Sequence, residues 1–160
     1  MKGLEMQLRI VKRLPMDEVR KMASDLEAKY EGNIDEIPDS FAEGKIQREA
    51  FEDYVEWMGM EHALRAYREG EDFDYFIEEI IETDIKDLSK LSPRRMELMD
   101  QLSRLRVQSI NELASSIGRD VKNVYMDLKI LENFGFVHLV REGKNLIPDL
   151  LVKEITYLTW

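Results

Sequence analysis

Three cations and one amide lie close together in residues 119–129, with the spacing of a helix face that can contact nucleic acid. The four side chains are those of Arg119, Lys122, Asn123 and Lys129. At about 100° per residue they fall on one side of a helix, and Met126 lies among them. Ammonium and guanidinium groups contact phosphates, and a side-chain amide can pair with the edge of an adenine. We therefore predict that a helix over residues 120–134 contacts DNA.

The opposite side of this helix is apolar, and further candidate contacts lie outside it. The apolar side consists of Val121, Val124, Leu128 and Leu131. A polar segment, "REGKN", separates two apolar segments and is predicted to be the tip of a β-hairpin. The candidate DNA contacts beyond the helix are Ser109, at the start of the preceding helix, and Arg141, Lys144 and Asn145 at the hairpin tip.

Capping residues predict two more helices before this one. Ser92 stands before Pro93, and proline is favoured at the first position of a helix. Ser109 is followed three residues later by Glu112, which is the spacing of a capping box. Asp120 is placed to cap the third helix. Three helices followed by a hairpin predict a winged helix-turn-helix.

The sequence of this region resembles a known family. The phrases "LSPRRMELMDQL", "SINELASSIGRDVKNVYMDLKILENFGFV" and "REGKN" are similar to archaeal winged helix-turn-helix regulators of the broad multiple-antibiotic-resistance-regulator type. The resemblance covers residues 92–147, about a third of the chain. It implies DNA binding by Arg119, Lys122 and Asn123, supported by Lys129 and the hairpin. Met126 departs from the pattern, because such regulators often carry a polar residue there.

The N-terminal half has weaker patterns. "LEMQLRIV" alternates apolar and polar residues, which predicts a strand over residues 4–10. It has no partner next to it in the sequence, and "KEITYLTW" is a candidate partner within the chain or across a dimer. Helical spacing predicts helices over residues 16–30 and 46–69. The spacing of Phe73, Phe76, Ile77, Ile80 and Ile81 predicts a third amphipathic helix. "NIDEIPDS" is predicted to be a loop.

Charge divides the chain near residue 88. Residues 1–88 contain 12 Lys and Arg against 24 Asp and Glu, whereas residues 89–160 contain 11 against 9. We therefore predict two parts: an acidic region over residues 1–88 and a DNA-binding domain over residues 89–160. The fold class is mainly α (α+β). Three roles remain open for the acidic region: dimerisation, binding of a protein partner, or sensing of a small molecule.

Several classes of function find no support in the sequence. The chain has no cysteine, which excludes disulfides, thiolate metal sites and cysteine nucleophiles. Its two histidines, His62 and His138, lack the spacing of metal ligands. No apolar segment approaches the roughly 18 residues that span a membrane, and the start does not read as a signal peptide. We expect a cytoplasmic protein without enzyme activity, metal or cofactor.

The expected function is sequence-specific binding of double-stranded DNA by a transcriptional regulator, most simply as a homodimer that reads two half-sites. The alternative is a protein-interaction module, such as an antitoxin or a complex subunit, whose winged helix contacts protein. In that case the acidic N-terminal half can bind a protein partner as well.

Overall fold

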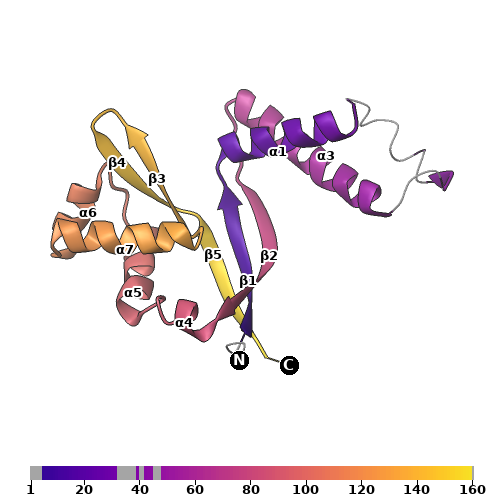
Figure 1. Cartoon of the computed structure of the whole chain (residues 1–160). Helices are drawn as coiled ribbons and strands as arrows, with labels where there is room; N and C mark the ends of the chain where they lie inside the picture. Colours follow the sequence, from indigo (N-terminus) through magenta and orange to yellow (C-terminus); the bar gives the residue numbers. More distant parts are fainter. Residues whose placement is uncertain (1–4, 32–38, 40–41, 45–47, 160) are drawn as a thin grey trace. The chain divides into compact units, whose positions relative to one another are not determined.

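The computed structural model describes residues 5–31, 39, 42–44 and 48–159 (Figure 1). The described residues have a mixed α+β structure and divide into two compact units. One unit contains Met1–Lys12 and Ile77–Trp160, and the other contains Arg13–Phe76. The charge boundary at residue 88 does not coincide with this division, because most of each of two strands from the acidic half belongs to the first unit.

The first unit contains the three helices and the hairpin predicted from the sequence. The helices are α5 (Pro93–Arg104), α6 (Ile110–Ile117) and α7 (Val121–Asn133). Strands β3 (Val137–Glu142) and β4 (Asn145–Leu150) pair in antiparallel fashion and form a two-stranded sheet. The predicted elements of this region are therefore confirmed.

The predicted caps determine where these helices begin. The hydroxyls of Ser92 and Ser109 and the carboxylate of Asp120 each accept the backbone N–H three residues further on, at 3.3, 3.0 and 3.3 Å. Glu112 accepts the N–H of Gln108 at 2.8 Å, one residue before the cap. Gly118 ends α6 in the left-handed conformation, with φ of 68°, which glycine adopts without steric cost.

A second sheet joins the two ends of the chain. Its strand order is β2-β1-β5, where β1 is Glu5–Leu14, β2 is Tyr75–Asp84 and β5 is Val152–Leu158. Strands β1 and β5 are antiparallel, with Gln7 opposite Leu158. The sequence predicted that the N-terminal strand pairs with residues 153–160 either within the chain or across a dimer. In the structure β1 pairs with β5 of the same chain.

The helix predicted over residues 73–81 is wrong, since residues 75–81 lie in β2, which leads to the short helix α4 (Ile85–Leu88). Along β2 the residues alternate between half-buried and exposed, beginning with half-buried Tyr75 and exposed Phe76. Isoleucines at positions 77, 80 and 81 match a helical spacing, but an edge of β1 is available to pair with an extended chain. Pairing with β1 and the β-branched side chains decide in favour of the strand.

One hydrophobic core connects the N-terminal strand to the three helices. Leu8 and Ile10 of β1 are buried in it. The helices, the hairpin and their connections contribute Leu98, Met99, Leu102, Val107, Ile110, Leu113, Ala114, Val124, Leu128, Leu131, Phe136 and Val137. The fold of residues 89–160 therefore uses side chains from the first ten residues of the chain.

The second unit is built on α1 (Met16–Lys29) and α3 (Arg48–Arg68), which pack against each other. Tyr30 Oη and Lys29 Nζ donate hydrogen bonds to Asp53 Oδ2 at 2.6 and 2.8 Å. Burial alone would raise the pKa of Asp53, but these two donors outweigh it, and the pKa is lowered. The predicted loop "NIDEIPDS" lies outside the described residues, except for Asp39.

Candidate nucleic-acid interface

The exposed face of α7 carries four of the nine side chains predicted to contact DNA. Lys122, Asn123 and Lys129 are exposed, and Met126 has 54% of its surface accessible. Val121 was predicted to be buried, but it is exposed, because it lies in the first turn of α7 beyond the packed part of the helix. The face therefore combines two cations and an amide with apolar side chains.

Arg119 does not belong to this exposed face, and its predicted position is wrong. Its side chain is only 12% exposed, and Nη2 lies 2.6 Å from Asp127 Oδ2. Arg119 follows the left-handed Gly118 and precedes the cap of α7, so it is not part of the helix. Its guanidinium instead reaches the inner side of α7, where it binds a carboxylate.

Asp127 is a structural residue behind the candidate interface that sequence analysis missed. It is 9% exposed and is a buried charged residue on the packed side of α7. A second cation, Arg95 of α5, donates from Nε to Asp127 Oδ1 at 3.0 Å and from Nη1 to the carbonyl of Lys90 at 2.8 Å. The signal was present, since Asp127 lies three residues after Val124 and next to Leu128, among apolar positions. A carboxylate there requires cationic partners.

The two arginines and Asp127 form an ion cluster that determines the position of α7. Arg95 belongs to the first turn of α5, Arg119 to the turn between α6 and α7, and Asp127 to the middle of α7. Charged hydrogen bonds at these distances are short and directional. The cluster therefore holds the outer face of α7 at a defined angle to α5 and α6.

Glu132 connects the end of α7 to the hairpin. Its carboxylate accepts the backbone N–H of Leu139 in β3 at 3.0 Å and binds Lys129 Nζ at 2.9 Å. Burial would raise the pKa of Glu132, but the hydrogen bonds from Lys129 and Leu139 outweigh it, and the pKa is lowered. Lys129 thus remains exposed but is held on the helix surface.

The remaining candidates lie at the ends of neighbouring elements. Arg141, Lys144 and Asn145 are exposed around Gly143, the left-handed residue of the hairpin turn. The half-buried hydroxyl of Ser109 accepts the N–H of Glu112, and Ser109 is therefore a helix cap in the structure. The hairpin tip adds two cations to the charged surface of this unit.

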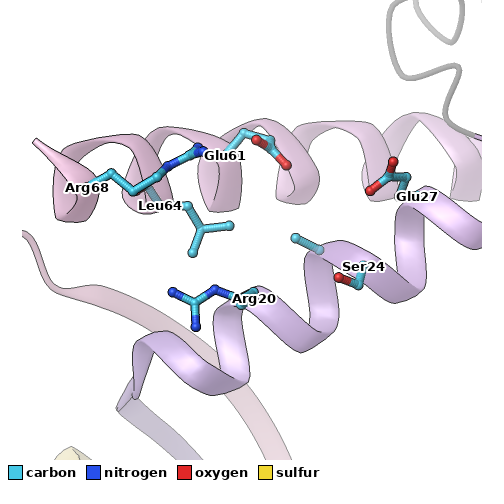
Figure 2. Close-up of a pocket in the computed structure, with 7 residues that line it drawn as sticks. Arg20, Ser24, Glu27, Glu61, Leu64 and Arg68 are labelled. Carbon is cyan, nitrogen blue, oxygen red and sulfur yellow. The ribbon is translucent and has the colours of Figure 1, made fainter.

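The second unit contains a groove away from the candidate interface. It lies between α1 and α3, has a volume of about 260 Å³, and is shown in Figure 2. Its lining includes Arg20, Ser24, Glu27, Glu61, Leu64 and Arg68. Arg20 pairs with Asp17, and Arg68 donates to the carbonyl of Leu64. The groove thus contains charges of both signs, and its two arginines already have partners within the chain. This lining does not favour one class of ligand.

The described part of the chain offers neither a metal site nor a membrane-spanning helix. No group of three or more His, Asp or Glu side chains is placed to hold a metal ion there. No helix within those residues is both long enough and apolar enough to cross a membrane.

The comparisons with known proteins gave one match. Residues 90–156 match the model of the family described as HVO_A0114. This match covers less than half of the 160 residues of the chain. The matched segment extends from just before α5 into β5 and includes both α7 and the hairpin. The searches of curated proteins and of solved structures found no match.

Proposed function

We propose that this chain is a sequence-specific DNA-binding transcriptional regulator. In this proposal α5, α6, α7 and the β3–β4 hairpin form a winged helix-turn-helix, and α7 enters the major groove. The observation that carries the proposal is the outer face of α7. There Lys122, Asn123 and Lys129 are exposed together on a helix that the ion cluster holds from behind.

The position of the polar residues along α7 supports this function. The major groove is about 12 Å wide and admits one helix, whose N-terminal part then contacts base edges. Lys122 and Asn123 lie in the first turn of α7, immediately after the Asp120 cap. In this proposal Asn123 reads an adenine, while Lys122 and Lys129 contact phosphates.

The hairpin supplies a second contact with the duplex. Arg141 and Lys144 flank the turn at Gly143, and both are exposed. In a winged helix-turn-helix these side chains lie against the phosphate backbone or in the minor groove. Each phosphate contact made by a cation adds about 0.9 to the slope of log affinity against log salt.

Selection of duplexes from a random library, followed by anisotropy titration, tests this function. We expect one enriched sequence, an affinity for it well above that for its scrambled version, and a steep fall in affinity with salt. The function is wrong if no sequence is enriched and the protein does not shift any duplex at low salt.

A second function is favoured by one observation, the exposed apolar side chains of α7. Val121, Tyr125 and Met126 are each at least 41% exposed. A helix with exposed apolar side chains can dock in a groove of another protein. Replacing Met126 with alanine then weakens partner binding, whereas replacing Lys122 has little effect. If α7 binds DNA instead, replacing Lys122 should weaken binding more than replacing Met126 does.

A further inference from the structure

Met126 is the most exposed of the large apolar side chains of α7, with 54% of its surface accessible. On the surface of a helix the neighbours of a residue are those three and four positions away. For Met126 these are Lys122 and Asn123 in the preceding turn and Lys129 and Ile130 in the following turn. One exposed apolar side chain therefore lies between two lysines and an amide.

These neighbours do not form the stripe with which a helix docks in an apolar groove of another protein. Such a stripe needs apolar side chains at positions i, i+3 or i+4, and i+7. Lys122 and Lys129, on either side of Met126, are instead exposed cations. Ile130 is already half-buried within the chain, and Tyr125 is about 100° away around the helix. An apolar groove closed over Met126 would also remove two charges from water, which costs free energy.

The major groove of DNA suits a face with an apolar centre and cations beside it. On the floor of the groove, thymine exposes the methyl group at C5 next to its O4 acceptor. Phosphates border the groove, and lysines contact them. Apolar side chains contact the thymine methyl group directly. The lysines of α7 thus match the charge of the groove borders, and Met126 matches the apolar group on its floor.

We propose that Met126 contacts the 5-methyl group of a thymine and is a specificity-determining residue of α7. This inference rests on the proposed function, because it requires α7 to enter the major groove. It names the chemical group that the centre of this face selects, which is the methyl group of an A·T pair.

Asn123 and Met126 read neighbouring base pairs in this arrangement. Met126 follows Asn123 by three residues, which is about 4.5 Å along the helix axis. Successive base pairs are about 3.4 Å apart. The adenine that pairs with Asn123 and the thymine that contacts Met126 are therefore one step apart. We expect adjacent A·T pairs in the preferred sequence.

The arginine that was predicted for this face does not compete for the same position. Guanine is contacted most often through O6 and N7 by arginine or lysine. The guanidinium of Arg119 binds Asp127 behind α7, and α7 itself contains no arginine. In the proposed function the two lysines of the face contact phosphates. The side chains left to read bases are an amide and a thioether, and both suit A·T pairs.

Replacement of single thymines by deoxyuridine tests the contact. Deoxyuridine lacks only the 5-methyl group and keeps the base pair and the O4 acceptor. The probe is the duplex enriched from the random library, with one thymine replaced at a time and the affinity measured by anisotropy. We expect a loss of about fourfold at one thymine position, which corresponds to the ~0.8 kcal/mol of one buried apolar carbon group. Replacement of the other thymines should have little effect.

Variants of Met126 assign this loss to one side chain. M126A should bind the thymine and deoxyuridine duplexes equally, since the methyl group has lost its partner. M126L, which has a similar volume, should keep the preference for thymine. M96A is the matched control, because it removes a similarly exposed methionine from α5, and it should also keep the preference. Circular dichroism checks that each variant is folded.

Failure of this inference is distinct from failure of the proposed function. Specific binding that is indifferent to every deoxyuridine replacement overturns the methyl contact and leaves DNA binding intact. A preference for thymine that M126A retains also overturns it, because another residue then reads the methyl group. If the parent binds no duplex at all, the proposed function is wrong and this inference fails with it.

Discussion

Arg119 Nη2 lies 2.6 Å from Asp127 Oδ2, and this ion pair ties the turn before α7 to the middle of that helix. Arg95 binds the other carboxylate oxygen, so one buried acid holds two cations from different elements. The exposed face of α7 is on the opposite side of the helix. Its orientation therefore depends on residues that are buried or half-buried behind it.

Removing the acid of this cluster should strongly destabilise the fold. In D127A two largely buried guanidinium groups lose their counter-charge, and breaking such a buried pair costs about 3 kcal/mol or more. The matched control is D100A, which removes the exposed pair with Arg104 on α5 and should cost less than about 1 kcal/mol. Urea unfolding of both variants measures the difference, and equal costs would show that the cluster is not a structural element.

Arg119 should affect stability rather than the number of phosphate contacts. We expect R119Q to lower the free energy of unfolding, because Asp127 keeps only one of its two cationic partners. The salt dependence of DNA binding should keep the parent's slope, since the buried guanidinium does not displace counterions from DNA. Anisotropy at several salt concentrations, under conditions where the variant is folded, measures that slope. A slope that falls by about one unit would instead place Arg119 at a phosphate.

The sequence predicted what depends on local chemistry and missed what depends on tertiary contacts. The caps at Ser92, Ser109 and Asp120 act within three residues, and each was predicted and found. The wheel that placed Arg119 outside assumed that it was helical, whereas the left-handed Gly118 places it before the helix. Only the folded chain shows that its guanidinium can reach Asp127.

The strand β2 illustrates the same limit. Its isoleucines fit both a helical and an extended spacing, and the choice depends on β1, which lies about seventy residues away in the sequence. The candidate site follows the same division. The exposed positions of Lys122, Asn123 and Met126 follow from helical periodicity. The burial of Asp127 could be inferred from its apolar neighbours, but its two cationic partners are visible only in the tertiary structure.

The connection between α7 and the hairpin should depend on pH. The pKa of Glu132 in the folded state lies below its ordinary value of 4.5, so folding favours the charged form. Its stabilisation is complete above pH 4.5 and is lost as the pH falls through the lower, folded-state pKa. The difference in melting temperature between the parent and E132Q should therefore be largest near neutral pH and shrink in acid. E97Q, at an exposed residue of α5, is the control. A difference that does not change with pH would contradict the role assigned to Glu132.

The outer face of α7 should separate two kinds of DNA contact. Lys122 is an exposed cation, and we expect K122A to weaken binding equally for specific and scrambled duplexes. The same change should lower the salt slope by about one unit, because one phosphate contact is lost. Asn123 carries no charge, so N123A should leave the slope nearly unchanged and cost about 1–3 kcal/mol on the preferred sequence only. K153A, in β5, is the control for a lysine outside the proposed interface and should bind like the parent. Salt titrations of fluorescence anisotropy with both duplexes measure all three variants. If K122A and N123A bind like the parent at every salt concentration, this face does not touch DNA, and Val121, Tyr125 and Met126 become the centre of a protein-contact surface.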